Sequence, residues 1–124
     1  MSPILTKAAE KDYFRRTRIF PIMHLIGIRN DVLASHPELP AKLFDGFERA
    51  RQQARQDLDK VAYLNAMLPW LIDHLAETRD AMGNDYWTYG VDGNRAVIET
   101  MCRYAFEQGL TDRLLSAAEL FAPV

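Results

Sequence analysis

The feature that most constrains the fold is a continuous apolar run near the start of the chain, from Ile19 to Arg29. Its branched and aromatic residues suit a β-strand, and a strand that is apolar on both faces usually lies inside a sheet covered by helices. Pro21 cannot donate a hydrogen bond to a strand ladder, so pairing is expected to begin after it. The sequence therefore predicts one main buried strand over about residues 20–29.

No second run of this kind follows, and one strand alone leaves its backbone N–H and C=O groups without partners. The rest of the chain shows the three- and four-residue spacing of apolar side chains that is typical of amphipathic helices. We predict helices over about residues 37–62, 69–82 and 92–108, with a short C-terminal turn over 116–121. The whole chain, 1–124, is thus expected to be a single partial domain, mostly α with one main buried β-strand.

Three local patterns refine this prediction. The first long helix begins near Pro37 or Pro40, because proline suits only the first helical turn. Ser116 and Glu119 have the spacing of a capping box. Cys102 lies on the apolar face of the last long helix and is expected to be a buried small hydrophobe. It is the chain's single cysteine, which fits a reducing compartment.

The composition excludes several classes of partner. A net charge of −2 gives no reason to expect nucleic acid or an anionic membrane. No apolar run approaches the length of about 20 residues that a membrane helix needs. The opening residues, Met1–Lys7, lack the features of a secretory signal. We therefore expect a cytoplasmic protein that binds neither nucleic acid nor membrane.

Motifs that would identify a reaction directly are absent. The chain has no glycine-rich phosphate loop, no His or Cys pair at metal spacing and no nucleophile elbow. Arg15, Arg16 and Arg18 crowd the start of the apolar run, as a solvated basic corner or as an anion site. The aromatic loop over 84–90 is either a hydrophobic plug between helices or a pocket wall.

Several segments, some of them rich in tryptophan, proline and glycine, form an ordered pattern: Asp12–Thr17 with Ile19–His24, Met67–Leu71, Met82–Gly90, Asn94–Arg95, Arg103–Tyr104, Glu107–Leu110 and Glu119–Pro123. Together these segments resemble the 4,5-dihydroxyphthalate decarboxylase family. The likeness runs in order from about Ala8 onward. Two positions depart from the family pattern, because Arg18 stands where the family is expected to have glycine and Thr88 where it is expected to have proline.

The resemblance implies a fold, a reaction and partners. Family members are similar to type II periplasmic-binding proteins, with two α/β lobes and the ligand between them, and they are much longer than this chain. The chain therefore resembles the C-terminal part of such a protein, and its strand would pair with a missing N-terminal lobe or with another copy in a homo-oligomer. The implied enzyme is a lyase of phthalate degradation, a carboxy-lyase that converts a dihydroxylated aromatic dicarboxylate to 3,4-dihydroxybenzoate without oxidation. The alternatives are a small-anion binding module without turnover, or an inactive truncated remnant.

That chemistry needs a proton donor, cations for the remaining carboxylate and a surface for the ring. His24 is the candidate catalytic residue, since imidazole exchanges protons near neutral pH; the competing interpretation is a core histidine bonded to a backbone carbonyl. The candidate substrate-binding residues are cationic or aromatic: Arg16, Arg18, Trp87, Tyr89 and Arg95. Arg95 could instead pair with an acid. No cofactor is expected, and a divalent metal is left open.

Overall fold

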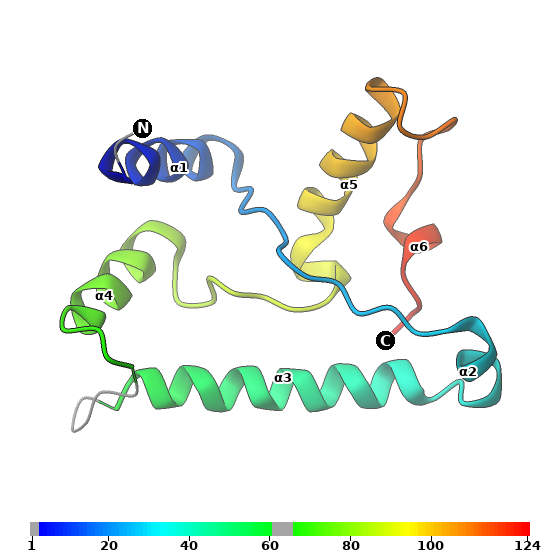
Figure 1. Cartoon of the computed structure of the whole chain (residues 1–124), viewed down its shortest axis with the longest axis horizontal. Helices are drawn as coiled ribbons and strands as arrows, with labels where there is room; N and C mark the ends of the chain where they lie inside the picture. Colours follow the sequence, from blue (N-terminus) through cyan, green and yellow to red (C-terminus); the bar gives the residue numbers. More distant parts are fainter. Residues whose placement is uncertain (1–2, 61–65) are drawn as a thin grey trace.

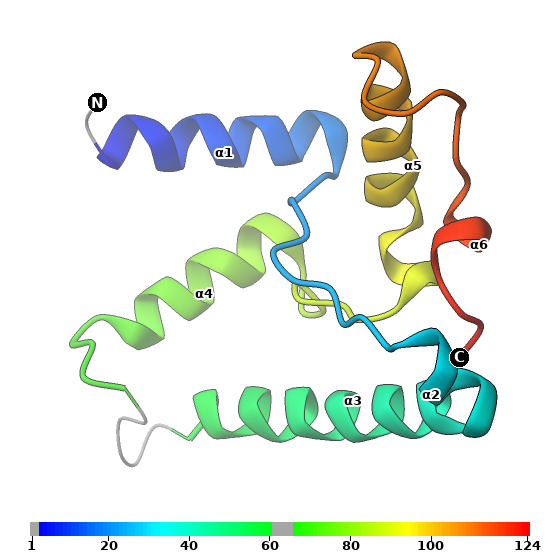
Figure 2. The same cartoon turned by 45° about the vertical axis from the view of Figure 1, so that its right-hand side comes forward.

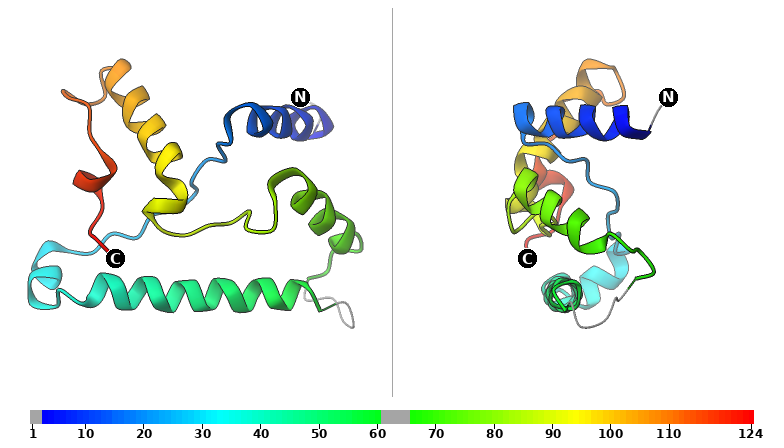
Figure 3. Two further views of the ribbon diagram at one scale, coloured as in Figure 1. Left: turned by 180° about the vertical axis from the view of Figure 1, so that it is seen from behind. Right: turned by 90° about the vertical axis from the view of Figure 1, so that its left-hand side faces the viewer.

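The computed structural model describes residues 3–60 and 66–124, and these residues form helices joined by irregular segments. The helices are α1 (Pro3–Thr17), α2 (Asn30–Ser35), α3 (Leu39–Leu58), α4 (Leu71–Met82), α5 (Val91–Glu107) and α6 (Ala117–Leu120). The long α3 runs along one side of the molecule, and the segment between α1 and α2 crosses the middle (Figure 1). The view from behind shows the same crossing beside α5 (Figure 3).

The predicted buried strand over about residues 20–29 is wrong. The segment is irregular from residue 18 to residue 29, and no strand occurs anywhere in the described part of the chain. It is not buried either, because Met23, Leu25 and Ile26 are 66%, 63% and 61% exposed. A strand needs a neighbouring strand to satisfy its backbone groups, and the described residues supply none. The expectation of a mostly α chain with one main strand is therefore replaced by helices alone.

The helices follow the apolar spacing of the sequence. In place of the expected 37–62, α3 spans Leu39–Leu58; residues 61 and 62 lie outside the described part of the chain. It begins one residue before Pro40, which suits the first turn because the missing N–H has no acceptor there. The helices α4 and α5 occupy the regions expected at 69–82 and 92–108. Within the described residues, no helix is both long and apolar enough to cross a bilayer.

The small core lies where α5 meets the C-terminal segment. Ile98 and Cys102 on α5 pack with Ala117 of α6, and all three are 3% exposed or less. The predicted capping box is confirmed, because the backbone N–H and hydroxyl of Ser116 both donate to the Glu119 carboxylate, at 2.9 and 2.8 Å. The prediction that Cys102 is buried is also confirmed.

One carboxylate on α4 binds two lysines of α1. Lys7 and Lys11 of α1 both donate to Glu77 of α4. The hydrogen bond from Lys11, followed by the one from Lys7, lowers the pKa of Glu77 from 4.5 to about 2. A carboxyl whose pKa is lowered by folding stabilises the folded state above its unfolded pKa, and this contribution is lost as the pH falls through the folded value.

We therefore expect the chain's resistance to urea to fall between pH 4.5 and about 2 as Glu77 is protonated. Replacing Glu77 with glutamine removes the titrating group, so the variant should be less stable near neutral pH and lose less stability across this range. Urea midpoints measured by circular dichroism at several pH values test this. Equal pH dependence in both proteins would contradict the assignment.

Candidate functional site

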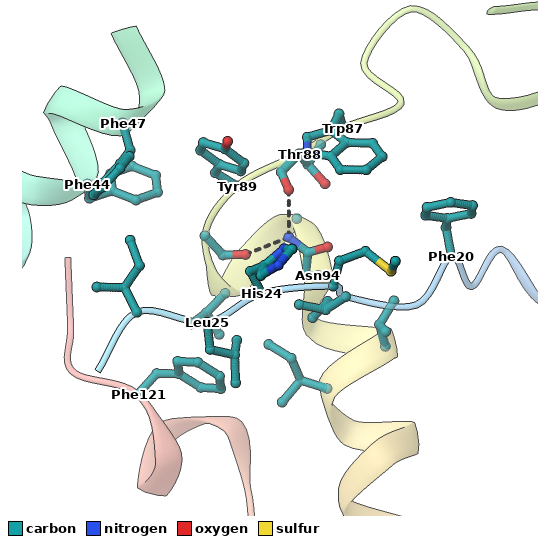
Figure 4. A pocket seen from close by; sticks show the side chains of 18 of the residues that line it. Phe20, His24, Leu25, Phe44, Phe47, Trp87, Thr88, Tyr89, Asn94 and Phe121 are labelled. Atoms are coloured by element: carbon teal, nitrogen blue, oxygen red, sulfur yellow. Dashed lines mark hydrogen bonds between the residues drawn. The ribbon is translucent and has the colours of Figure 1, made fainter. Parts of the chain in front are cut away.

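A cavity of about 640 Å³ lies between the segment that follows α1, helix α3, the loop after α4 and the first turns of α5. Figure 4 shows side chains from all four parts facing the cavity, with Phe121 from the C-terminal segment. Figure 2 shows why they meet: the segment after α1 and the loop after α4 run close together between the helices.

Aromatic side chains line much of this cavity. Phe44 and Phe47 come from one face of α3, and Trp87 and Tyr89 come from the loop. Phe20 packs against Trp87 with ring centroids 5.9 Å apart and a tilt of 53°, a geometry that aromatic pairs prefer. The cavity thus offers flat apolar surfaces on opposite sides.

The aromatic loop is held to α3 by two arginines. Nη1 of Arg51 donates to Asp85 Oδ1 at 2.8 Å and to the carbonyl of Trp87 at 3.0 Å. Its guanidinium also lies 5.7 Å from the centroid of the Tyr89 ring. Arg55 donates to the same Asp85 oxygen at 2.7 Å. We call Arg51, Arg55 and Asp85 the arginine clamp.

A carboxylate on α3 holds Arg51 of the arginine clamp in place. Glu48 accepts hydrogen bonds from Arg51 Nε at 2.8 Å and Nη2 at 2.5 Å. The Arg51 side chain is only 10% exposed, so these bonds also compensate for the lost hydration of its charge. The hydrogen bond from Arg51 lowers the pKa of Glu48 to about 2.

The end of the loop is fixed by Asn94 and shaped by Gly90. Nδ2 of Asn94 donates to the carbonyls of Thr88 at 3.1 Å and Gly90 at 2.9 Å (Figure 4). Gly90 has φ of +84°, and a Cβ at this position would lie 3.0 Å from Cε2 of Phe44. Glycine therefore allows the loop to approach α3 closely.

The structure brings four of the six predicted site residues to the cavity. His24, Arg18, Trp87 and Tyr89 all line it. The imidazole of His24 is exposed and forms no hydrogen bond with any residue that the structure describes. It is thus not the core histidine of the competing interpretation.

The other two predicted residues lie apart from the lining. Arg16 pairs with Asp12 at 2.9 Å, and Arg95 pairs with Asp92 at 2.8 Å. Both pairs connect neighbouring turns of one helix at exposed positions, where ion pairs contribute little to stability. In the described part of the chain, no three acidic, histidine or cysteine side chains are grouped so that they could hold a metal ion.

Comparison with known proteins relates this chain to a family. No protein-family model matches the chain. A 4,5-dihydroxyphthalate decarboxylase of Comamonas testosteroni is 35% identical to it over 115 residues, which is 93% of this chain. This match supports assigning the chain to the 4,5-dihydroxyphthalate decarboxylase family. The matched region is 35% of the Comamonas protein, so the chain spans about a third of that decarboxylase's length.

One departure from the decarboxylase family pattern has a structural consequence. Arg18, expected to be glycine in the family, has φ of +59° and is the one non-glycine residue with positive φ in the described chain. Its guanidinium lies 5.2 Å from the centroid of the Phe14 ring. A left-handed conformation costs a side-chain-bearing residue about 1–2 kcal/mol, so glycine suits this position.

We expect Arg18→Gly to be more stable than Arg18→Ala by about 1 kcal/mol, because both remove the guanidinium but only glycine relieves the left-handed strain. Denaturant unfolding of the two variants side by side measures this difference. An alanine variant as stable as the glycine variant would contradict the strained conformation.

The sequence analysis missed Phe20, Phe44, Phe47, Asn94 and the arginine clamp as parts of this site. Phe44 and Phe47 follow the helical spacing of core residues. The sequence therefore does not distinguish a residue that lines the cavity from one that packs in the core. The sequence analysis named Asn94 only within a segment that resembles the decarboxylase family. The clamp joins Asp85 to arginines 34 and 30 positions before it, and no local pattern predicts such a contact.

Proposed function

We propose that the chain is the C-terminal portion of a 4,5-dihydroxyphthalate decarboxylase-like protein. Its cavity would bind a dihydroxylated aromatic dicarboxylate, and the reaction would remove one carboxylate as carbon dioxide to leave 3,4-dihydroxybenzoate. The enzyme would then be an aromatic carboxy-lyase. The kinship with the Comamonas decarboxylase supports this reaction class.

The observation that carries the proposal is a free imidazole in an aromatic cavity. His24 faces the space between the α3 phenylalanines and the loop aromatics (Figure 4). Trp87 and Tyr89 can stack on a substrate ring, and His24 can then reach its edge. Asp85 also borders the cavity, but its carboxylate is engaged by Arg51 and Arg55. Of the imidazole and carboxylate side chains in the described lining, His24 is therefore the one available for acid–base chemistry, and the Tyr86 and Tyr89 hydroxyls lie in the same lining.

The proposed reaction proceeds by protonation of the ring. Each carboxylated carbon of the substrate has a hydroxyl group para to it, and this oxygen supplies electron density to that carbon. The protonated His24 imidazole donates its proton to the carbon, the bond to the carboxylate breaks, and the electron pair of that bond restores the aromatic ring. Carbon dioxide leaves, and the route requires no electron sink of the pyridoxal type.

The carboxylate that stays needs a cation. Arg18 lines the cavity, and a guanidinium binds a carboxylate through two parallel hydrogen bonds. In this proposal Arg18 orients the diacid so that the other carboxylated carbon lies near His24. Because the family is expected to have glycine here, this anchor would be particular to this chain.

One observation favours a second function, the binding of an aromatic anion without turnover. The carboxylate side chain of the described lining, Asp85, is engaged by Arg51 and Arg55, whereas the reaction also needs a base for the ring hydroxyl. A binding module would need only the aromatic walls and Arg18.

Turnover distinguishes the two functions. The purified chain is incubated with 4,5-dihydroxyphthalate, with and without a divalent metal, and 3,4-dihydroxybenzoate is quantified by liquid chromatography. Product above a buffer blank is expected for the decarboxylase. Substrate binding without product would support the binding module instead.

A further inference from the structure

Side chains from two helices hold the backbone of the aromatic loop. The Trp87 carbonyl accepts a hydrogen bond from Arg51 of α3 at 3.0 Å. The carbonyls of Thr88 and Gly90 accept from Asn94 of α5 at 3.1 and 2.9 Å (Figure 4). Three of the four carbonyls over residues 87–90 are thus bonded to side chains outside this stretch. These bonds fix the points from which the loop's aromatic rings project into the cavity.

The two arginines of the arginine clamp also lie over two rings of the loop. The Arg51 guanidinium is 5.7 Å from the centroid of the Tyr89 ring, and the Arg55 guanidinium is 5.7 Å from that of Tyr86. Residues four positions apart share one face of a helix, and Asp85 Oδ1 accepts hydrogen bonds from both arginines at 2.8 and 2.7 Å. The arginines therefore hold ring orientation as well as backbone position, because a cation is attracted to the face of a ring.

The arginines themselves do not border the space that a ligand would occupy. The loop enters the described cavity lining through residues 85–90, whereas Arg51 and Arg55 are not among the lining residues. Their charges are also shared with the carboxylates of Glu48 and Asp85. A substitution of either arginine can therefore affect a ligand through the loop or through charge at a distance, but not by direct contact.

We propose that Arg51 and Arg55 are positioning residues that give the cavity a preference for flat aromatic diacids over saturated ones. This inference rests on the proposed function, because it concerns the ring-stacking surface of the same site. Rings that are already held in one orientation lose less freedom when a ligand binds. Aromatic rings attract each other only in particular relative orientations, and a puckered saturated ring gains little from them. The arginine clamp would thus determine which class of diacid binds best.

Two diacids that differ in their ring test this inference. Phthalate and cis-cyclohexane-1,2-dicarboxylate both carry carboxylates on neighbouring carbons, so Arg18 and any distant charge should act on them alike. Titration calorimetry gives the Kd of each, and the ratio of the two Kd values isolates the contribution of the flat ring. The unsubstituted chain is expected to prefer phthalate.

In Arg51→Lys this preference should fall about two- to tenfold, the worth of an oriented ring contact. Lysine keeps the positive charge but lacks the planar fork of arginine. It cannot replace the bonds to Glu48, Asp85 and the Trp87 carbonyl together. A purely structural role for Arg51 would weaken both diacids by the same factor and leave the ratio unchanged.

A second variant and a control complete the experiment. Arg55→Met should lower the preference in the same direction; its side chain is 26% exposed, so the variant should remain folded. Arg49→Met is the control, because Arg49 is on the same helix and pairs with Asp45 at 3.6 Å, away from the loop. It should keep the ratio of the unsubstituted chain. Circular dichroism checks that every variant keeps its helices.

The outcomes separate this inference from the proposed function. If the unsubstituted chain binds phthalate without preferring it, or if both clamp variants keep the preference, the positioning role is overturned and the proposed function stands. If the unsubstituted chain binds neither diacid, the proposed function is overturned together with the positioning role. A preference that falls in both clamp variants but not in Arg49→Met is the result that supports the inference.

Discussion

Replacing His24 with alanine is expected to lower the rate of 3,4-dihydroxybenzoate formation by about 10²–10⁴-fold, the usual contribution of a positioned general acid. The imidazole is exposed in the cavity and bonded to no described residue, so its removal should leave the fold intact. Rates at saturating substrate, with circular dichroism of the variant, measure this effect.

The matched control is His36→Ala. This histidine is exposed outside the cavity, with Nδ1 3.9 Å from a Glu38 carboxylate oxygen. It should retain the full rate. An unchanged rate in His24→Ala would remove His24 from the catalytic mechanism, and an equal loss in both variants would point to a general effect on the protein.

Replacing Arg51 with methionine is expected to lower the free energy of unfolding by about 2–4 kcal/mol, since a mostly buried cation and its hydrogen bonds are lost together. Glu48 would keep its charge beside an apolar side chain, and the carbonyl of Trp87 would lose its donor. The loop should become mobile, so the fluorescence of Trp87 should change even where the chain stays folded.

Arg49→Met is the control for this prediction. Arg49 is on the same helix, is 74% exposed and pairs with Asp45 at 3.6 Å. Loss of an exposed pair should change stability by less than about 1 kcal/mol. Equal destabilisation by the two substitutions would contradict a specific role for the arginine clamp.

The helices could be predicted from the sequence because their signals are local. The apolar spacing of α3 and the capping box at Ser116 each involve residues a few positions apart, and local backbone geometry decides the outcome. The absence of the predicted strand could not be recognised in this way. Its residues have the composition of a strand, but a strand also needs a partner at a distance, and the composition of Ile19–Arg29 carries no information about that partner.

Part of the candidate site could also be predicted, because some of its residues lie in segments whose composition stands out in the sequence. The aromatic loop and His24 are conspicuous in the sequence, and both reach the cavity. Arg16 and Arg95 were chosen for their charge alone, and each pairs with an acid on its own helix. The contacts that shape the loop come from Arg51 and Asn94, and they depend on how α3 and α5 pack.

The central claim is that this cavity binds an aromatic diacid, and titration calorimetry with 4,5-dihydroxyphthalate tests it most directly. The unsubstituted chain is expected to give a saturable heat of binding. Trp87→Ala should weaken the affinity about tenfold through loss of ring stacking. An absence of saturable heat, or an affinity unchanged by Trp87→Ala, would contradict the assignment of the substrate to this cavity.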